Sequence, residues 1–370
     1  MPDELAELVA QLRDGGEDVV VLYGERVLAD PAGAAALVAI ADALNLRGRD
    51  GAGLIGVPSS ANARGLREAG VLPFAGPGLT AVEPPGRSTA EIAAAAAAGE
   101  LAALWLVGTD PLETHPDRAT WNAGLEQAST VIAHAGYLTA GVREHATIVF
   151  PTESHAEHEG TVVHPDGRVQ RLRQAIARPG EVRAGWWILS ELAKRLDVDM
   201  RVLTGPMVST QLFAAVPFYT GLTLDAIGGK GLRWPADERA AASWPAGAAP
   251  SAPDVPAPAT EVEDGRLRLG NYRSVWSGPE VAASPALHFL RARTRVELSP
   301  HDAQRLGVFD GDKVTVGDGD GVAIDASVSL RAAIPTGSAF LEGNGVEGPL
   351  VDVRKRPAPE PADPEPVALS

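Results

Sequence analysis

The sequence predicts an α/β protein in which a doubly wound, mostly parallel sheet is followed by a small β-barrel. Three observations support this prediction. Apolar runs typical of buried strands alternate with helical patterns over the first half of the chain. Hydrophobic residues make up 45% of the chain and aromatic residues only 5%, so the core is built from Ala, Val and Leu, which suits helices on a parallel sheet. Short strands with glycine turns follow towards the carboxyl end.

The first predicted elements alternate between helix and strand. Leucines at helical spacing predict a helix over 3–13. The continuous apolar run 19–23 has no alternation, which predicts a parallel strand that is buried on both faces. Asp-Pro at 30–31 is typical of an N-cap followed by the first helical residue, and the helix is expected to reach residue 44. The run 54–57 predicts the next strand.

The alternation continues to residue 150. Residues 88–91 form a Ser-x-x-Glu capping box before an alanine-rich helix, which is expected to stop at Gly99. Further apolar runs predict strands at 101–107, 131–133 and 147–150. Repeated strand–helix units of this kind predict the doubly wound sheet.

Beyond this sheet the pattern changes. Residues 161–163 and 168–170 are expected to pair as a hairpin around the Pro-Asp-Gly turn at 165–167, and a helix is expected over 186–196. The segment 244–260 consists mainly of Pro, Ala and Ser and predicts a linker. Short strands are then expected at 295–298, 313–316, 323–330 and 338–341.

These patterns predict four parts of the chain. Residues 1–243 form the α/β region, 244–260 the linker, 261–353 the barrel and 354–370 a disordered tail that is rich in Pro and Glu.

Charge and cysteine content exclude several classes of function. The formal net charge is −16, which disfavours binding to nucleic acid or to anionic lipid through a basic patch. The chain has no cysteine, so it forms no disulfide and supplies no thiolate to an iron–sulfur cluster. No apolar run is long enough to span a bilayer, and the amino terminus does not resemble a signal peptide. We therefore expect a cytoplasmic chain without membrane insertion.

Two turns lie where open α/β sheets bind ligands, at the carboxyl ends of predicted strands. The turn at 108–111 has backbone amides that can hold a phosphate, but the carboxylate of Asp110 opposes such a ligand. The turn at 24–26 offers Arg26 to an anion. We expect both turns to be vestiges of binding sites.

Two further groups of residues carry alternative interpretations. His155 and His158, with His145 and Glu153 nearby, are candidate metal ligands, although a solvated polar loop is the favoured interpretation and no metal is predicted. The tryptophans at 186, 187 and 276 either anchor a partner or pack between domains, and packing is favoured.

Three segments in order resemble the molybdopterin oxidoreductase family. The segment 146–170, ATIVFPTESHAEHEGTVVHPDGRVQ, resembles the family's pattern of a strand ending in Pro, then Glu-Gly-Thr and a Gly-Arg-x-Gln hairpin. The turn 108–111 resembles the family's Gly-x-Asn-Pro turn, and the segment 296–316 resembles the start of its double-psi barrel. The residues of the first segment that match are Pro151, Glu159, Gly160, Thr161, Gly167, Arg168 and Gln170.

The segment PSSANARG at 58–65 resembles, within this family, the G subunits of the respiratory NADH–quinone oxidoreductase. This resemblance implies a carboxy-terminal scaffold that supports electron transfer from NADH to quinone and is not itself catalytic. It implies that the iron–sulfur clusters lie in an amino-terminal part that this chain lacks, and that the partners are other peripheral-arm subunits at the inner face of the cell membrane.

The alternative is part of a molybdenum enzyme of the formate dehydrogenase or nitrate reductase type, which holds part of a molybdopterin guanine dinucleotide. The resemblance then implies that the pterin lies near Gly108, Thr109, Asp110, Glu159, Gly160, Thr161, Arg168 and Gln170. His164 and Asp110 stand where the family usually has Asn, which weakens this alternative.

Overall fold

The computed structural model describes ten stretches of the chain, which form two compact units. Residues 1–88 with 152–259 make up the first unit, and residues 89–151 with 260–370 make up the second. Each unit is described by itself. The described residues are 3–15, 18–29, 31–46, 51–115, 117–242, 265–291, 293–317, 323–343, 346 and 350–356.

The first unit begins with a two-stranded parallel sheet. Strand β1 pairs with β2 so that Val20 lies opposite Gly53, and Val19, Ala41 and Leu46 form a small core beside them. The expectation that this apolar strand is buried on both faces is wrong, since Leu22 is 68% exposed. Among the described residues β1 pairs with β2 alone, so its second edge has no strand beside it. The elements are α1 (Asp3–Gly15), β1 (Val20–Gly24), α2 (Arg26–Ala29), α3 (Pro31–Ala43) and β2 (Gly53–Val57).

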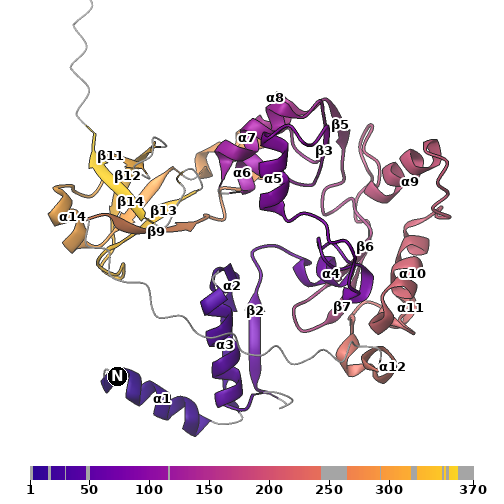
Figure 1. Ribbon diagram of the computed structural model, residues 1–370, viewed down its shortest axis with the longest axis horizontal. Coiled ribbons are helices and arrows are strands. Elements are labelled where there is room, and N and C mark those ends of the chain that lie inside the picture. The colour runs from indigo at the N-terminus through magenta and orange to yellow at the C-terminus, as the bar shows by residue number, and fades with distance from the viewer. Residues whose placement is uncertain are drawn as a thin grey trace, which may run out of the picture. The chain divides into compact units, whose positions relative to one another are not determined.

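The rest of the first unit is built on a small antiparallel sheet in the order β6-β7-β8 (Figure 1). Its core is unusually aromatic for this chain and contains Phe213, Phe218, Tyr219 and Trp234. The elements are α4 (Ala63–Glu68), η2 (Pro77–Leu79), β6 (Gly160–Val163), β7 (Arg168–Leu172), α9 (Gly185–Arg195), α10 (Gly205–Ala215), η3 (Pro217–Tyr219), α11 (Leu224–Ile227), β8 (Leu232–Arg233), η4 (Trp234–Ala236) and α12 (Glu238–Ala241).

The second unit contains a three-stranded parallel sheet in the order β3-β4-β5. Helices α5 and α7 pack closely because Gly124 of α7 has no side chain. A Cβ at Gly124 would lie only 2.9 Å from the Cβ of Ala96 on α5. Alternate residues of β3, Leu104 and Leu106, join this core. The elements are α5 (Thr89–Ala97), β3 (Ala103–Val107), α6 (Pro111–Thr114), α7 (Arg118–Gln127), β4 (Thr130–Ala135), α8 (Ala140–His145) and β5 (Ile148–Pro151).

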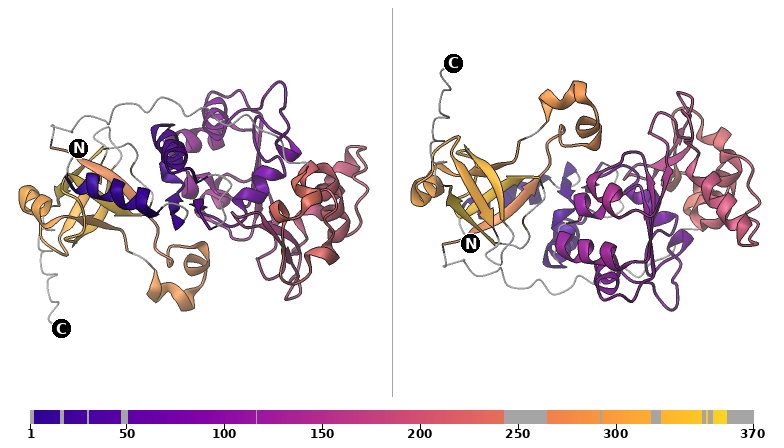
Figure 2. Two further views of the ribbon diagram at one scale, coloured as in Figure 1. Left: turned by 90° about the horizontal axis from the view of Figure 1, so that it is seen from below. Right: turned by 90° about the horizontal axis from the view of Figure 1, so that it is seen from above.

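The second unit also contains a closed barrel of six strands in the order β10-β12-β11-β14-β9-β13. Figure 2 shows these strands, in orange to yellow, from two opposite sides. The interior is filled by small branched side chains such as Val296, Val314 and Leu341. The elements are β9 (Leu267–Tyr272), α13 (Pro279–Ala283), η5 (Pro285–Leu290), β10 (Arg295–Leu298), α14 (Pro300–Leu306), β11 (Lys313–Gly317), β12 (Ala323–Leu330), β13 (Ser338–Glu342) and β14 (Leu350–Lys355).

Helix α14 shows why the sequence at 299–307 folds as it does. Ser299 caps the helix by accepting a hydrogen bond from the backbone N–H of Asp302, and Gly307 ends it at φ 68°. The carboxylate of Asp302 is buried, and it accepts hydrogen bonds from the Ser299 hydroxyl at 2.6 Å and from the Gly337 N–H at 2.8 Å. One short helix thus also fixes the turn before β13.

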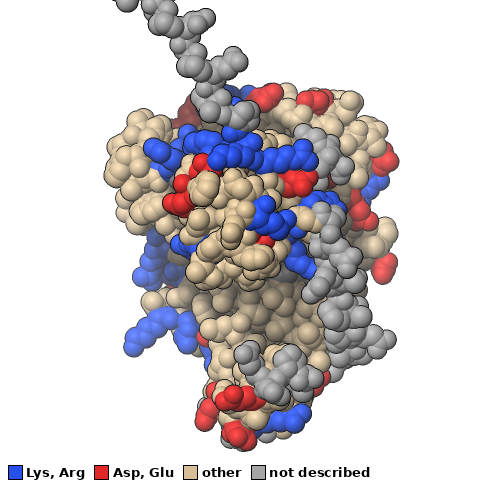
Figure 3. Space-filling model, turned by 90° about the vertical axis from the view of Figure 1, so that its left-hand side faces the viewer, with Lys and Arg blue, Asp and Glu red and all other residues tan. Residues whose placement is uncertain are grey.

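The barrel surface mixes both signs of charge. Lys355 pairs with Asp312 at 2.7 Å, and Arg354 pairs with Asp352 at 3.2 Å. Figure 3 shows basic and acidic side chains interspersed on the face towards the viewer. Exposed pairs of this kind contribute little to stability and favour solubility.

The predicted fold class is confirmed by the parallel sheets and by the closed barrel. Strands β9 and β14 were not predicted, and β14 includes Arg354 and Lys355, which the sequence analysis placed in the tail. The predicted linker 244–260 lies outside the described residues, and the domain boundaries stay a prediction. Within the described part of the chain, no helix combines the length and the apolar character that crossing a membrane requires.

The barrel core generates a stability prediction. Replacing the fully buried Leu298 by Ala is expected to lower the free energy of unfolding by about 2–5 kcal/mol, because it removes apolar contacts and leaves a cavity. Urea denaturation followed by circular dichroism measures the change. Leu330→Ala, at a 36% exposed position of the same barrel, is the matched control and is expected to cost much less. Equal losses in the two variants would contradict the assignment of the core.

Candidate functional site

The candidate site residues fall into two groups. Gly108, Thr109 and Asp110 belong to the second unit, at the carboxyl end of β3. The remaining five, from Glu159 to Gln170, belong to the first unit and lie on or beside the β6–β7 hairpin. Each group is therefore considered within its own unit.

The carboxylate of Asp110 is directed into the protein. Asp110 is only 5% exposed, and as the N-cap of α6 it accepts a hydrogen bond from the Leu112 N–H at 3.0 Å. Its second oxygen accepts a hydrogen bond from the Thr139 hydroxyl. It lies so close to Gly141 that a Cβ there would approach the carboxylate oxygen to 2.5 Å. Asp110 therefore joins the starts of α6 and α8.

The other two residues of this turn also bond within the protein. The Gly108 N–H donates to the carbonyl of His134 at 2.9 Å, and Gly108 adopts a left-handed φ of 64°. The Thr109 hydroxyl lies 3.0 Å from the hydroxyl of Thr114, which in turn donates to the Asp110 carbonyl at 2.9 Å. The turn is thus closed by its own hydrogen bonds.

The hairpin of the first unit is held by the side chains of its turn. His164 Nδ1 lies 2.8 Å from Asp166 Oδ1, which also accepts a hydrogen bond from the Arg168 N–H at 3.0 Å. Burial opposes ionisation of Asp166, but these hydrogen bonds outweigh it and place the pKa of this carboxyl below its ordinary value. His164, which replaces the family's usual Asn, therefore stabilises the turn.

The hairpin strands place the remaining candidates in register. Thr161 lies opposite Arg171, and Gln170 lies opposite Val162. The side chains of Arg168 and Gln170 pack against Gly231, where a Cβ would approach the Cγ of Gln170 to 2.9 Å. This contact brings the segment before β8 onto the hairpin.

Glu159 lies beside an ion pair that precedes the hairpin. Arg178 donates from Nε to Glu153 at 2.6 Å, and its Nη2 lies 3.9 Å from Glu159. Glu153 also accepts a hydrogen bond from the Gly185 N–H at 3.2 Å, at the start of α9. A Cβ at Gly205 would approach Glu159 Oε1 to 2.7 Å. Glu159 thus contacts the first turn of α10.

Sequence reasoning missed the network that fixes the hairpin turn. Asn62 accepts a hydrogen bond from the Val163 N–H at 2.9 Å. Arg64 donates to the Pro165 carbonyl and to Glu68, the latter at 2.7 Å, and its guanidinium stacks over Trp234 at 5.2 Å. The resemblance at 58–65 points to this segment, but it does not indicate the roles of Asn62 and Arg64.

The centre of this network is Glu68, which is 2% exposed. The hydroxyl of Tyr219 donates a hydrogen bond to its second oxygen. Burial and this hydrogen bond raise the pKa of Tyr219 far above its ordinary value, so the phenol stays protonated and remains a donor. The carboxylate is therefore satisfied from both sides.

The histidines considered as metal ligands are not assembled into a site. Among the described residues there is no group of three or more His, Asp or Glu side chains that could hold a metal ion. Glu153 is engaged by Arg178, and Glu157 accepts a hydrogen bond from the Ser154 N–H at 2.9 Å.

His134, at the end of β4, is a buried histidine that sequence reasoning also missed. Its ring packs edge-on against Trp105 and Phe150, with centroid distances of 5.5 and 5.3 Å. Burial lowers the pKa of His134, since the charged imidazolium would lose its hydration. The side chain is thus a neutral part of the sheet next to Gly108.

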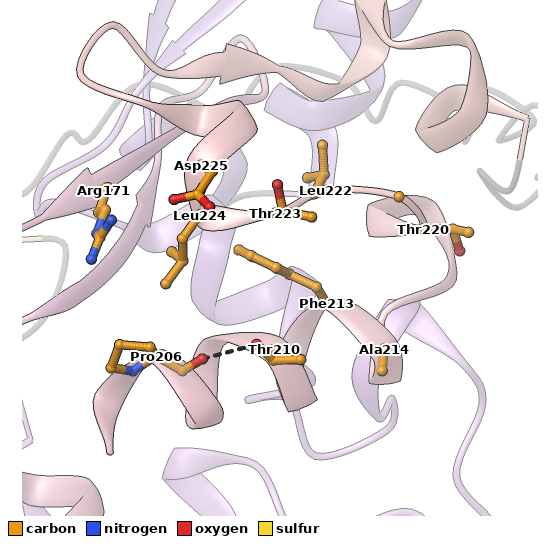
Figure 4. Close-up of a pocket in the computed structure, with 11 residues that line it drawn as sticks. Arg171, Pro206, Thr210, Phe213, Ala214, Thr220, Leu222, Thr223, Leu224 and Asp225 are labelled. Carbon is orange, nitrogen blue, oxygen red and sulfur yellow. Dashed lines mark hydrogen bonds between the residues drawn. The ribbon is translucent and has the colours of Figure 1, made fainter.

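A cavity of about 640 Å³ opens in the first unit between β7, α10 and α11 (Figure 4). Arg171 enters it from β7, and Asp225 enters it from α11. Phe213 and Leu222 are buried apolar residues of its lining. The sequence analysis did not single out residues 205–225, because the cavity forms only when β7, α10 and α11 pack together.

Asp110 generates a stability prediction. Asp110→Ala is expected to lower the free energy of unfolding by about 1–3 kcal/mol, because it removes a helix cap and the buried acceptor of the Thr139 hydroxyl. Thermal or urea denaturation measures the loss. Asp110→Asn keeps a capping oxygen and is expected to lose less. Unchanged stability of the Ala variant would show that the carboxylate has no structural role.

His134 generates a prediction on pH dependence. Because its folded-state pKa is depressed, the unfolded chain takes up a proton more readily than the folded chain. This stability contribution is complete above the ordinary histidine pKa and is lost as the pH falls through the folded value. The free energy of unfolding of His134→Leu is therefore expected to fall less than that of the wild type between about pH 7.5 and pH 5. Parallel pH profiles of the two proteins would refute this role.

Comparisons with known proteins place these features in a family. The sequence profile described as molybdopterin oxidoreductase matches residues 8–195, which is half of the chain. The NADPH-Fe(3+) oxidoreductase subunit alpha of Geobacter sulfurreducens is 28% identical over 90% of this chain and 39% of its own length. The G 2 subunit of the NADH-quinone oxidoreductase of Rhizobium meliloti is 27% identical over 92% of this chain and 41% of its own length.

A relative of a different type is the nitrate reductase of Klebsiella oxytoca, which is 28% identical over 70% of this chain and 33% of its own length. Among solved structures, acetylene hydratase from Pelobacter acetylenicus superposes with a TM-score of 0.51 at 16% identity. That match covers 71% of this chain and 40% of the other, and it supports the fold alone. With the profile match over residues 8–195, the chain belongs to the molybdopterin oxidoreductase family.

Proposed function

We propose that this chain is the carboxy-terminal scaffold part of a G-type subunit of NADH–quinone oxidoreductase. In this role it supports electron transfer from NADH to quinone and carries no redox centre. The alignment with the G 2 subunit of Rhizobium meliloti over 92% of this chain is the observation that carries the proposal. The chain spans about two fifths of the length of that relative and of the Geobacter protein.

The absence of cysteine supports the proposal that another part of the enzyme holds the iron–sulfur clusters. Iron–sulfur clusters are held by thiolates, and none of the 370 residues supplies one. In the proposal, the clusters that transfer electrons belong to a part of the enzyme outside this chain. This chain contributes a folded surface on which that part and the other peripheral-arm subunits assemble, at the inner face of the cell membrane.

The family implies a molybdopterin, and the turn at Gly108–Asp110 does not fit its diphosphate. The diphosphate of a pterin dinucleotide needs free amides or cations, but the Gly108 N–H is already bonded to His134. The neighbouring carboxylate of Asp110 adds a negative charge, which opposes a bound diphosphate. Hydrogen bonds from the Leu112 N–H and the Thr139 hydroxyl hold this carboxylate in its position. We therefore derive no chemical step through a pterin.

The first unit has the character of a scaffold. The β6–β7 hairpin is held within the protein, since Asn62 binds the Val163 N–H, Arg64 binds the Pro165 carbonyl and Asp166 binds the Arg168 N–H. Internal hydrogen bonds of this kind give rigidity. Holding the hairpin in one shape is the function that these contacts support best.

One alternative has a specific observation in its favour. The nitrate reductase relative aligns over 70% of this chain, and Formate dehydrogenase H of Escherichia coli is 26% identical over 51% of it. The alternative is a fragment or subunit of a molybdopterin-dependent oxidoreductase that holds part of a pterin guanine dinucleotide. The engagement of Gly108 and Asp110 is why we rank it second.

Affinity purification tests the proposal. The chain, tagged at its genomic locus and extracted from membranes of its source cells in mild detergent, is expected to carry flavin and iron–sulfur subunits with it, together with NADH-dependent quinone reduction. An untagged strain is the control. Molybdenum in stoichiometric amount, with an oxidised pterin released on denaturation, would favour the alternative. Recovery without flavin or iron–sulfur protein would refute the scaffold role.

A further inference from the structure

The cavity between β7, α10 and α11 has the size of a small-molecule site. Its volume of about 640 Å³ lies within the range typical of ligand pockets, roughly 300–1,000 Å³. All of its walls belong to the first unit. The cavity shares no residue with the predicted cofactor group, although Arg171 follows Gln170 on β7.

Two side chains of opposite charge line this cavity. Arg171 and Asp225 both line it, on walls formed by different elements. Figure 4 shows the two side chains separated, with no interaction drawn between them. Among the described residues, neither side chain makes an ion pair or a hydrogen bond. A bound molecule can therefore supply the partner of each.

Another part of the cavity lining is apolar. Phe213 and Leu222 are buried, and the half-buried Leu224 adds to the same surface. Figure 4 shows Phe213 and Leu224 directed into the space between the two walls. An apolar group placed there loses its contact with water, which favours binding.

The threonines at the rim leave one free hydroxyl donor. Thr210 and Thr220 donate to the carbonyls of Pro206 and Pro217, respectively. The oxygen of Thr223 accepts a hydrogen bond from the Ala226 N–H at 3.1 Å, which leaves its own proton free. The cavity therefore offers a guanidinium and a hydroxyl as donors and a carboxylate as acceptor.

We propose that this cavity binds a small zwitterion of the amino-acid class with an apolar side chain. The ligand carboxylate pairs with Arg171, its ammonium pairs with Asp225, and its side chain packs on Phe213 and Leu224. A molecule with only one of these charges forms only one of the two ion pairs. This binding site is independent of the scaffold role and stands whether or not that role is confirmed.

Titration calorimetry on the full chain with L-phenylalanine tests the proposal. The probe is compared with 3-phenylpropanoate, which lacks the ammonium group, and with phenethylamine, which lacks the carboxylate. L-alanine tests the contribution of the apolar side chain. L-phenylalanine is expected to bind about tenfold or more tightly than each of the three analogues, since each lacks one of the interactions.

Two variants that each remove one charge separate the contributions of Arg171 and Asp225. Asp225→Asn is expected to weaken binding of L-phenylalanine about tenfold or more, and to leave 3-phenylpropanoate unaffected or bound more tightly. Arg171→Gln is likewise expected to weaken binding of L-phenylalanine about tenfold or more, and to leave phenethylamine unaffected or bound more tightly. Arg13→Gln and Asp14→Asn, at exposed positions of α1, are the matched controls and are expected to change nothing.

The outcomes are distinct. Selective loss of the expected probe in each variant, with circular dichroism unchanged, supports the two-point site. Failure of L-phenylalanine to bind at about 10 mM, or equal effects of both variants on all probes, overturns the proposal. Neither result depends on flavin or iron–sulfur subunits, so the test does not confuse this site with the scaffold role.

Discussion

The first unit depends on one buried carboxylate, that of Glu68. Removing a charge from water is costly unless it is paired and hydrogen-bonded, so Glu68 can occupy this position only if Arg64 and Tyr219 are both in place. Arg64 then reaches the hairpin turn at Pro165 and stacks on Trp234. The buried carboxylate of Glu68 thereby couples its own helix to Tyr219, which lies more than 150 residues away in the sequence. The shape of the hairpin follows from that coupling.

The same principle recurs in the second unit on a smaller scale. Asp110 and Asp302 are buried acids, the first as the cap of α6 and the second in the first turn of α14, and each also binds a second segment. A chain with only 5% aromatic residues has few large side chains with which to specify how its elements meet. Because an unpaired buried carboxylate is far less stable than a paired one, these acids select one arrangement where Ala and Val packing alone would permit several.

Local patterns predicted most of the strands and some of the helices, whereas helices α7, α10 and α14 and the contacts between distant segments escaped prediction. Apolar runs and caps identified the parallel strands, the hairpin and four of the six barrel strands, because these signals lie within a few residues of one another. Strand β9 escaped since LRLGNY contains glycine and only weak alternation. The bond from Arg64 to Pro165 spans 101 residues, and nothing in either segment alone indicates its partner. The site residues from Glu159 to Gln170 were found by resemblance, and a ligand role for them stays a prediction.

The order of strands in the barrel has a consequence for its biosynthesis. β14 lies between β11 and β9, so the ring closes only when Leu350–Lys355 has been made, more than 80 residues after β9 began. While the ribosome is still translating that interval, β9 and β11 each have one edge without its final neighbour. Open strand edges pair readily with other chains, and pairings between distant strands form slowly. The nascent barrel is therefore most exposed to misassembly during the last stage of its synthesis, when a chaperone that shields strand edges would have the greatest effect on yield.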